Sequence, residues 1–236
     1  MEYSIQYVLL NAVVILYDNA RWMSWNLFLA IVPLILSVLL FRRTQLGTST
    51  LIVPPLPLHL RHRSWLWWVG VLTFIAFLPN APYILTDVIH FIDEVRQYAH
   101  SVWIVTLVLI PLYVFFIFAG FEAYVVSLIN LGYYLKQRGL GRYILKAELA
   151  IHAMSAVGVY LGRFLRFNSW DIVTHLDALA MTILEDVLAK RPLLTIGVTF
   201  LLISALYVPL KQVNLAIAAY QKTSSKRLRS ANSLRF

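Results

Sequence analysis

The chain has 236 residues, of which 60% are hydrophobic and 13% are charged, and its formal net charge is +9. A soluble domain of this size cannot bury that much apolar surface, so we expect the lipid bilayer to be its solvent and exclude nucleic acid as the partner of the positive charge. The absence of cysteine excludes disulfides, thiol catalysis and cysteine-ligated metal centres.

Five apolar runs approach the roughly 20 residues that a helical membrane crossing requires. They are residues 24–41, 65–78, 101–120, 146–161 and 193–210. The second run reaches this length only if its helix continues through Pro79 and Pro82. A further run over residues 4–17 lacks the features of a signal peptide, so we expect it to be retained, as a short first span or as an interfacial segment. The sequence therefore predicts an all-α, polytopic membrane helix bundle with five or six transmembrane helices.

Basic residues gather in two connecting segments and in the C-terminal segment. If the five runs cross in alternation, these segments share one side of the membrane, which their positive charge identifies as cytoplasmic. The residues are Arg42, Arg43, Arg61 and Arg63; Lys136, Arg138, Arg142 and Lys146; and Lys211, Lys222, Lys226, Arg227, Arg229 and Arg235. We predict an inner-membrane protein with a cytoplasmic C-terminus, one transmembrane domain over residues 1–222 and a basic, flexible tail over residues 223–236.

The first unusual motif is the stretch 78–94, where two prolines and several polar residues interrupt an apolar run. Asn80 is a candidate cap for a helix whose first turn accommodates Pro82. Four polar residues then recur four, three and four positions apart, which places them on one stripe of that helix. They are Tyr83, Asp87, His90 and Glu94. We expect this stripe to lie at the outer membrane surface.

The second motif runs from Gly158 to Asp171 and reads GVYLGRFLRFNSWD. Beyond it, residues 172–188 alternate between apolar and polar with a helical period, which predicts an extracytoplasmic, interfacial amphipathic helix anchored by Trp170. If the preceding helix continues through this motif, Arg163 and Arg166 are one helical turn apart, a spacing at which both can hold one anionic group.

The predicted topology puts both motifs on the same face, where a carboxylate and a histidine from each can converge. These candidates for catalysis or for binding a divalent metal are Asp87 and His90 from the first motif and Asp171 and His175 from the second. The candidates for binding an anionic lipid or glycolipid headgroup are Asn80, Tyr83, Arg163, Arg166, Asn168 and Trp170. Structural roles remain open for all of them, as helix caps or as ion pairs that fasten the two motifs together.

Three ionisable residues within the apolar runs are expected to be structural. We expect His152 to form a hydrogen bond with a neighbouring helix. We expect Glu122 and Glu148 to form ion pairs with Lys146 or Arg142, which lie near the same ends of the runs.

Residues 77–90 (FLPNAPYILTDVIH) and 161–171 (LGRFLRFNSWD) together resemble an uncharacterised bacterial membrane family, the domain of unknown function 1361. The resemblance extends from about residue 25 to about residue 210. It implies a bacterial membrane protein with several spans, and it implies no activity, substrate or cofactor.

Three hypotheses for the function follow. The first is a cell-envelope membrane protein whose outer polar cluster binds or processes an anionic headgroup, and whether it is an enzyme stays open. The second is a non-catalytic scaffold or partner subunit. The third is a transporter component in which the proline-containing break lines a path.

Overall fold

The computed structural model describes residues 5–42, 65–165 and 190–233, and within these ranges every regular element is helical. The elements are α1 (Ile5–Ser37), η1 (Val38–Arg42), α2 (Trp65–Phe77), α3 (Asn80–Tyr83), η2 (Ile84–Asp87), α4 (Val88–Gln97), α5 (Val102–Ile104), η3 (Val105–Leu109), α6 (Ile110–Gln137), η4 (Gly141–Tyr143), α7 (Ile144–Phe164) and α10 (Lys190–Ser233). The helical stretches long and apolar enough to cross a membrane are Ile5–Arg42, Trp65–Gln97, Val102–Gln137, Gly141–Phe164 and Pro192–Ser224. The prediction of an all-α, multi-pass membrane protein is confirmed.

Large apolar side chains cover the outside of the helices. Phe115 is 74% exposed, Trp65 is 72% exposed and Leu194 is 71% exposed. In water such a surface would be an aggregation site, whereas in a bilayer it contacts lipid tails. The exposed surface therefore supports the conclusion, already drawn from the composition, that the lipid bilayer is the solvent of this protein.

The N-terminal apolar run is the first half of a longer helix. The helix α1 runs through residues 5–37 without a turn, so residues 5–17 extend the first candidate span and do not form a separate sixth span. The stretch Ile5–Arg42 has 38 residues and is about 57 Å long at 1.5 Å per residue. This length exceeds the roughly 30 Å hydrocarbon core, so the helix must tilt or project beyond it.

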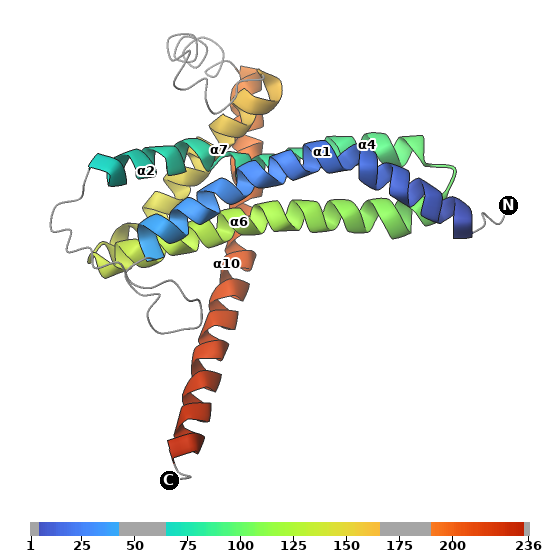
Figure 1. Cartoon of the computed structure of the whole chain (residues 1–236). Helices are drawn as coiled ribbons and strands as arrows, with labels where there is room; N and C mark the ends of the chain where they lie inside the picture. Colours follow the sequence, from blue (N-terminus) through green and yellow to red (C-terminus); the bar gives the residue numbers. More distant parts are fainter. Residues whose placement is uncertain (1–4, 43–64, 166–189, 234–236) are drawn as a thin grey trace.

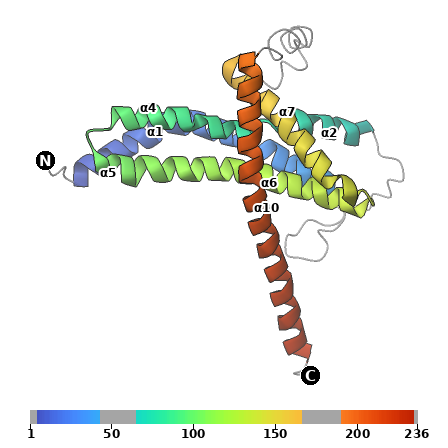
Figure 2. The ribbon, with the colours of Figure 1, turned by 180° about the vertical axis from the view of Figure 1, so that it is seen from behind.

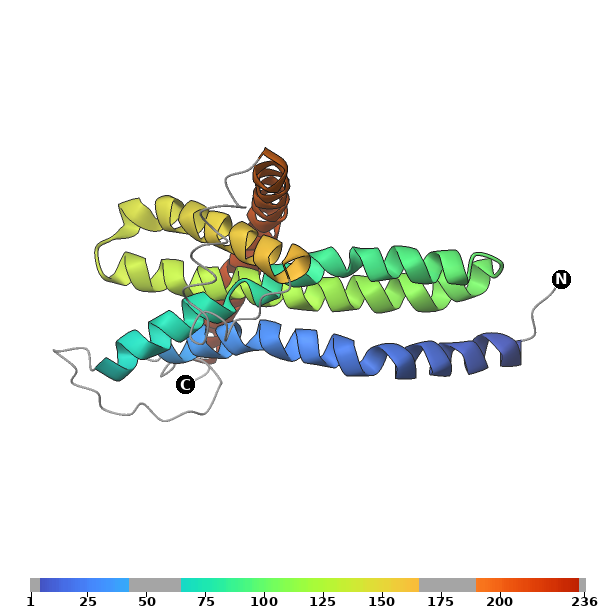
Figure 3. The same cartoon turned by 90° about the horizontal axis from the view of Figure 1, so that it is seen from above.

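Helices α1 and α6 lie side by side, and α2, α3 and α4 follow one another along them (Figures 1 and 3). Helix α7 packs against α10 and α6, and α10 crosses the other long helices at a steep angle (Figures 1 and 2). Helices that cross steeply cannot all follow the membrane normal, so the alternating topology and the cytoplasmic C-terminus stay predictions. Helix α10 also continues past residue 222 to Ser233, and the domain boundary at residue 222 likewise stays a prediction.

The proline-containing stretch interrupts a helix in its middle. Pro79 and Pro82 have no backbone N–H, so the helical hydrogen-bond ladder fails and some carbonyl groups lose their usual partners. Side chains bond to carbonyls in this stretch: Asn80 Nδ2 donates to the Phe77 carbonyl at 2.9 Å, and Thr86 Oγ1 donates to the Tyr83 carbonyl at 2.6 Å. Such local satisfaction is what makes a broken helix tolerable in a membrane protein.

The prediction that Asn80 caps the helix after the break is wrong. The residue at the cap position is Pro79, and Asn80 is already the first residue of α3. Pro79 has helical backbone angles, with φ −62° and ψ −20°, so the chain never adopts the extended conformation of a typical N-cap residue. The Asn80 amide bonds backwards to Phe77 because the helix bends here and does not start afresh.

Two glycines allow neighbouring helices to approach the break. A Cβ added at Gly158 of α7 would lie 2.7 Å from the Cβ of Pro79, and one added at Gly120 of α6 would overlap the side chain of Ile84. A larger residue at either position would push the helices apart. The break is therefore enclosed between α6 and α7, with α1 on a further side.

Candidate functional site

Asp87 is the centre of a polar cluster inside the helix bundle. Its side chain is 1% exposed and is therefore enclosed by protein, and the position of its stripe at the outer membrane surface stays a prediction. Asn26 of α1 donates a hydrogen bond from Nδ2 to Asp87 Oδ2 at 3.1 Å. The other carboxylate oxygen, Oδ1, is buried and has no hydrogen bond. Asp87 is the last residue of the turn η2, and its carboxylate contacts Asn26 of α1 and Arg163 of α7.

Arg163 reaches the same cluster from α7. Its Nη2 donates to the Thr86 carbonyl at 2.6 Å and lies 3.4 Å from Asp87 Oδ1, and its Nη1 donates to the Tyr83 hydroxyl at 3.3 Å. The close approach at Gly158, five residues earlier, brings this part of α7 to the break. The structure thus joins one binding candidate from the second motif to two candidates from the first.

The remaining candidates of the first motif are less central. His90 Nε2 lies 3.9 Å from Asp87 Oδ1, too far for a hydrogen bond, and the His90 side chain is 50% exposed. Its ring lies against Trp22, with 4.9 Å between the ring centroids. Glu94 is partly buried further along α4. The stripe from Tyr83 to Glu94 is therefore buried at Asp87 and more accessible beyond it.

Metal binding by the predicted acid and histidine pairs has no support in the described part of the chain. No group of three or more His, Asp or Glu side chains among these residues is arranged to hold a metal ion. Asp171 and His175, the second pair, lie outside the described residues, and so do Arg166, Asn168, Trp170 and the predicted amphipathic helix. Their roles stay predictions.

A second buried polar cluster joins α7 to α10. Lys211 Nζ donates to both oxygens of Glu148, at 2.6 Å and 2.8 Å, and the Tyr207 hydroxyl donates to Glu148 Oε1 at 2.7 Å. The prediction that Glu148 forms an ion pair with Lys146 or Arg142 is therefore wrong. The reason is that residue 211 lies one helical turn from residue 207 on α10, so both reach the same carboxylate.

The other two ionisable residues within the apolar runs also bind across helices. The Tyr124 hydroxyl and His152 Nδ1 are 2.7 Å apart, as expected for a histidine bonded to a neighbouring helix. Glu122 Oε1 accepts a hydrogen bond from Asn214 Nδ2 at 2.6 Å. The ion pair expected for Glu122 is therefore wrong, because an amide of α10 occupies that position.

Sequence reasoning missed Asn26, Tyr207, Lys211 and Asn214 as partners in these clusters. Lys211 was counted among the basic residues that set the topology, and Asn26 lies near the start of the apolar run 24–41 without any motif around it. One signal was available, because an amide or a charge inside an apolar span usually faces the protein interior and has a partner there. The identity of that partner was not readable from the sequence.

No curated protein and no solved structure matches this chain. The model of one protein family does match, over residues 25–205, and its description is "Protein of unknown function (DUF1361)". The matched range includes the break, Asp87 and the whole of α7 with Arg163. Because this range covers more than half of the chain, the protein belongs to the DUF1361 family of unknown function.

Proposed function

We propose that this multi-pass membrane protein binds an anionic lipid or cell-envelope headgroup through Arg163, with Asp87 as the residue that positions the guanidinium. The observation that carries the proposal is an incompletely made ion pair. The contact of 3.4 Å between Arg163 Nη2 and Asp87 Oδ1 is longer than the roughly 2.7–2.9 Å of a strong charged hydrogen bond. Asp87 Oδ1, the oxygen nearest this guanidinium, is buried and makes no hydrogen bond within the described part of the chain.

Arg163 also retains capacity for a ligand. A guanidinium has five N–H donors, and among the described residues Arg163 makes two hydrogen bonds. Its side chain is 16% exposed, so it is not fully enclosed by protein, and a guanidinium has pairs of N–H groups along its edges. A phosphate accepts two parallel hydrogen bonds from such an edge.

The charge balance sets a further requirement. Asp87 neutralises Arg163, so these two side chains alone attract an anion weakly. The proposal therefore needs Arg166, which follows Arg163 by three residues in the sequence and lies outside the described residues, after the end of α7 at Phe164. Two arginines and one carboxylate together have a net charge of +1, which suits a phosphate monoanion. Catalysis by Asp87, His90, Asp171 or His175 would be an addition to this binding role, and of the two described residues, Asp87 and His90, the more accessible is His90.

One alternative is a purely structural clasp in a non-catalytic scaffold. The burial of Asp87 and the 2.6 Å hydrogen bond from Arg163 to the Thr86 carbonyl favour it. Transport ranks third. The break within Trp65–Gln97 is the feature that favours it, but Glu122, Glu148 and His152 are engaged with other helices. Flux across the membrane of reconstituted vesicles that depends on Asp87 or Glu122 would support a transport function.

The test compares Arg163→Gln and Arg166→Gln with the control Arg96→Gln. Arg96 is 77% exposed on α4 and pairs only loosely with Asp93, at 3.5 Å. Each protein is reconstituted in nanodiscs that contain equal amounts of phosphatidylglycerol and phosphatidylcholine. The enrichment of phosphatidylglycerol beside the protein and the thermal stability are then measured. We expect both site variants to lower the enrichment several-fold and the control to leave it unchanged.

Two measurements distinguish the headgroup site from the structural clasp. They are the lipid enrichment of the Arg166→Gln variant and the thermal stability of the Arg163→Gln variant. If Arg163→Gln lowers only the stability, and Arg166→Gln has no more effect on lipid enrichment than the control, the headgroup proposal fails and the clasp remains. A well-folded Arg163→Gln variant with lost enrichment would exclude a purely structural role.

A further inference from the structure

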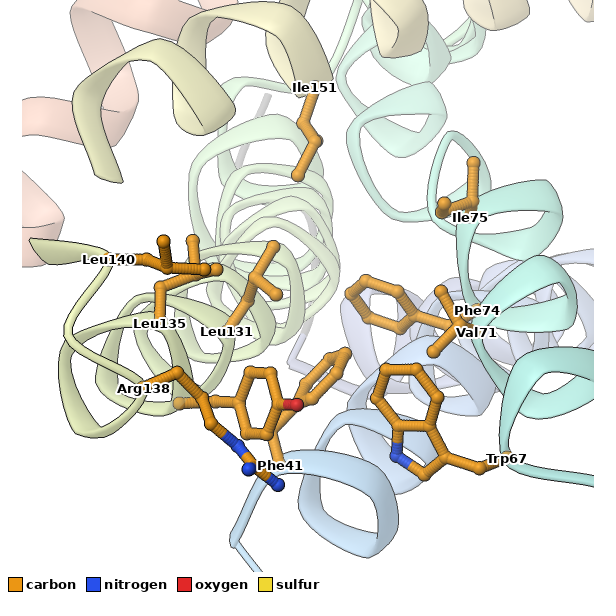
Figure 4. Close-up of a pocket in the computed structure, with 11 residues that line it drawn as sticks. Phe41, Trp67, Val71, Phe74, Ile75, Leu131, Leu135, Arg138, Leu140 and Ile151 are labelled. Carbon is orange, nitrogen blue, oxygen red and sulfur yellow. The ribbon is translucent and has the colours of Figure 1, made fainter. Parts of the chain in front are cut away.

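A cavity of about 330 Å³ lies between η1, α2, the C-terminal end of α6 and α7. Figure 4 shows Leu131, Leu135 and Leu140 on one side of it, and Trp67, Phe74 and Ile75 on the other. Its walls are almost entirely apolar. The volume is at the lower end of the range of roughly 300–1,000 Å³ for small-molecule sites.

The end of α6 builds the rim of this cavity. Gly139 has a left-handed backbone with φ +75°, and the N–H of Leu140 bonds to the Leu135 carbonyl at 2.9 Å while that of Gly139 bonds to the Lys136 carbonyl at 3.1 Å. This is the Schellman arrangement, in which the residue after the glycine folds back against the last helical turn. Leu140 and Leu135 thereby form one wall, and Arg138 remains at the edge.

Arg138 supplies the charge at the cavity. Its guanidinium lies 5.5 Å from the centre of the Tyr134 ring, and both residues line the cavity. Within the described ranges no carboxylate lies at ion-pair distance from Arg138. The nearby acid of α7, Glu148, is bound by Lys211 and Tyr207. The charge at the rim is therefore positive and uncompensated by any described acid.

We propose that this cavity holds one acyl chain of an anionic phospholipid, and that Arg138 binds the phosphate of the same molecule. An apolar cavity has no groups to hold water, and in a bilayer the abundant apolar molecule is a lipid chain. Moving that chain from other lipids into the cavity changes its apolar contacts little. Selectivity must therefore come from the headgroup, and a basic pocket between helices selects an anionic one.

The neighbouring residues fit a position at the membrane surface. Trp65, Trp67 and Trp68 begin α2 beside the cavity, and tryptophan is enriched where hydrocarbon meets headgroups. Arg142 is near the same end, just before α7. A lipid in this position would have its chain between α2 and α6 and its phosphate beside Arg138, which lines the cavity, whereas Arg142 does not line it. This site is separate from the Asp87 cluster and does not depend on it.

The experiment uses the full chain in nanodiscs of equal phosphatidylglycerol and phosphatidylcholine, with a photoreactive group on the acyl chain of one lipid at a time. We expect phosphatidylglycerol to cross-link to residues lining the cavity, such as Trp67 and Leu135. Arg138→Gln should lower this cross-linking about fivefold, because the lipid in the cavity loses the one basic group that lines it. It should leave cross-linking of phosphatidylcholine nearly unchanged. Soluble glycerol phosphate, which has no chain, should not compete.

Two further variants separate the cavity from general surface attraction. Ile75→Trp fills the cavity without changing charge, and Leu140→Trp fills it from the exposed turn, where helix packing is less disturbed. Both should lower cross-linking of both lipids. Arg142→Gln is the matched control at the same end, and it should have little effect. Equal losses for Arg138→Gln and Arg142→Gln, or full cross-linking in a folded cavity-filling variant, would overturn the proposal.

Discussion

Replacing Lys211 with methionine tests how strongly the Glu148–Lys211 pair holds α10 against α7. Lys211 makes two contacts with the Glu148 carboxylate, at 2.6 Å and 2.8 Å, and the Glu148 side chain is 7% exposed. Without the lysine, the carboxylate keeps the Tyr207 hydroxyl as its one hydrogen-bond donor among the described side chains. The variant therefore leaves a buried charge that must be neutralised or hydrated at a cost.

The size of the effect follows from burial. Removing one partner of a buried ion pair costs about 3–5 kcal/mol, and the Lys211 side chain is 25% exposed, so we take the lower end, about 3 kcal/mol. Glu148→Gln should cost about 1 kcal/mol, because an amide still accepts a hydrogen bond across the helices. The double variant has a neutral amide in place of the Glu148 carboxylate and should be more stable than Lys211→Met alone. The coupling between the two sites should then be about 2–3 kcal/mol.

The assay is unfolding by titration with sodium dodecyl sulfate in mixed micelles, followed by circular dichroism at constant pH. Lys222→Met is the matched control, because Lys222 is exposed on the same helix. It should change the free energy of unfolding by less than about 0.5 kcal/mol. The reasoning would be refuted if Lys211→Met lost no more unfolding free energy than the control. It would also be refuted if the loss in the double variant equalled the sum of the losses in the two single variants.

Two other predictions concern helix contacts. Gly158→Val should lower the free energy of unfolding by about 1–3 kcal/mol, because the added atoms would meet Pro79 in the break between α2 and α4. Gly197→Val is the control, since nothing lies within 4 Å of a Cβ added there. Equal effects of the two variants would contradict the close approach at Gly158. Tyr124→Phe should lower the free energy of unfolding by about 0.6–1.7 kcal/mol, because it removes the hydrogen bond to His152. The control Tyr143→Phe, at an exposed position, should lower it less in the same titration. A Tyr124→Phe variant with an unchanged free energy of unfolding would show that the hydrogen bond does not stabilise the protein.

The positions of the apolar helices were largely readable from the sequence. A helix in lipid must be apolar over many consecutive residues, so the composition of a short window identifies it. The break at Pro79 and Pro82 was equally readable, because a proline removes a hydrogen bond wherever it stands in a helix. The effect of the break on the helix was not readable. The sequence suggested that a new helix starts here, whereas the chain bends inside one long helix and the Asn80 side chain bonds back to the Phe77 carbonyl.

The partners of the polar residues depended on the tertiary structure. Asp87 lies far along the chain from Asn26 and Arg163, and Glu148 is equally remote from Lys211. Local patterns contain no information about which distant side chain will lie opposite, and charge counting suggested nearer partners for Glu148.

The sequence by itself determined the solvent, the helical class and the family of this protein, because each depends on local composition or on a contiguous motif. Only the tertiary structure placed Asp87 in the interior, closed α7 onto the break at Gly158, and opened a cavity beside Arg138. The physical reason is that burial and pairing depend on how the helices approach and cross. Those approaches are decided by small residues and bends that act between helices far apart in the chain.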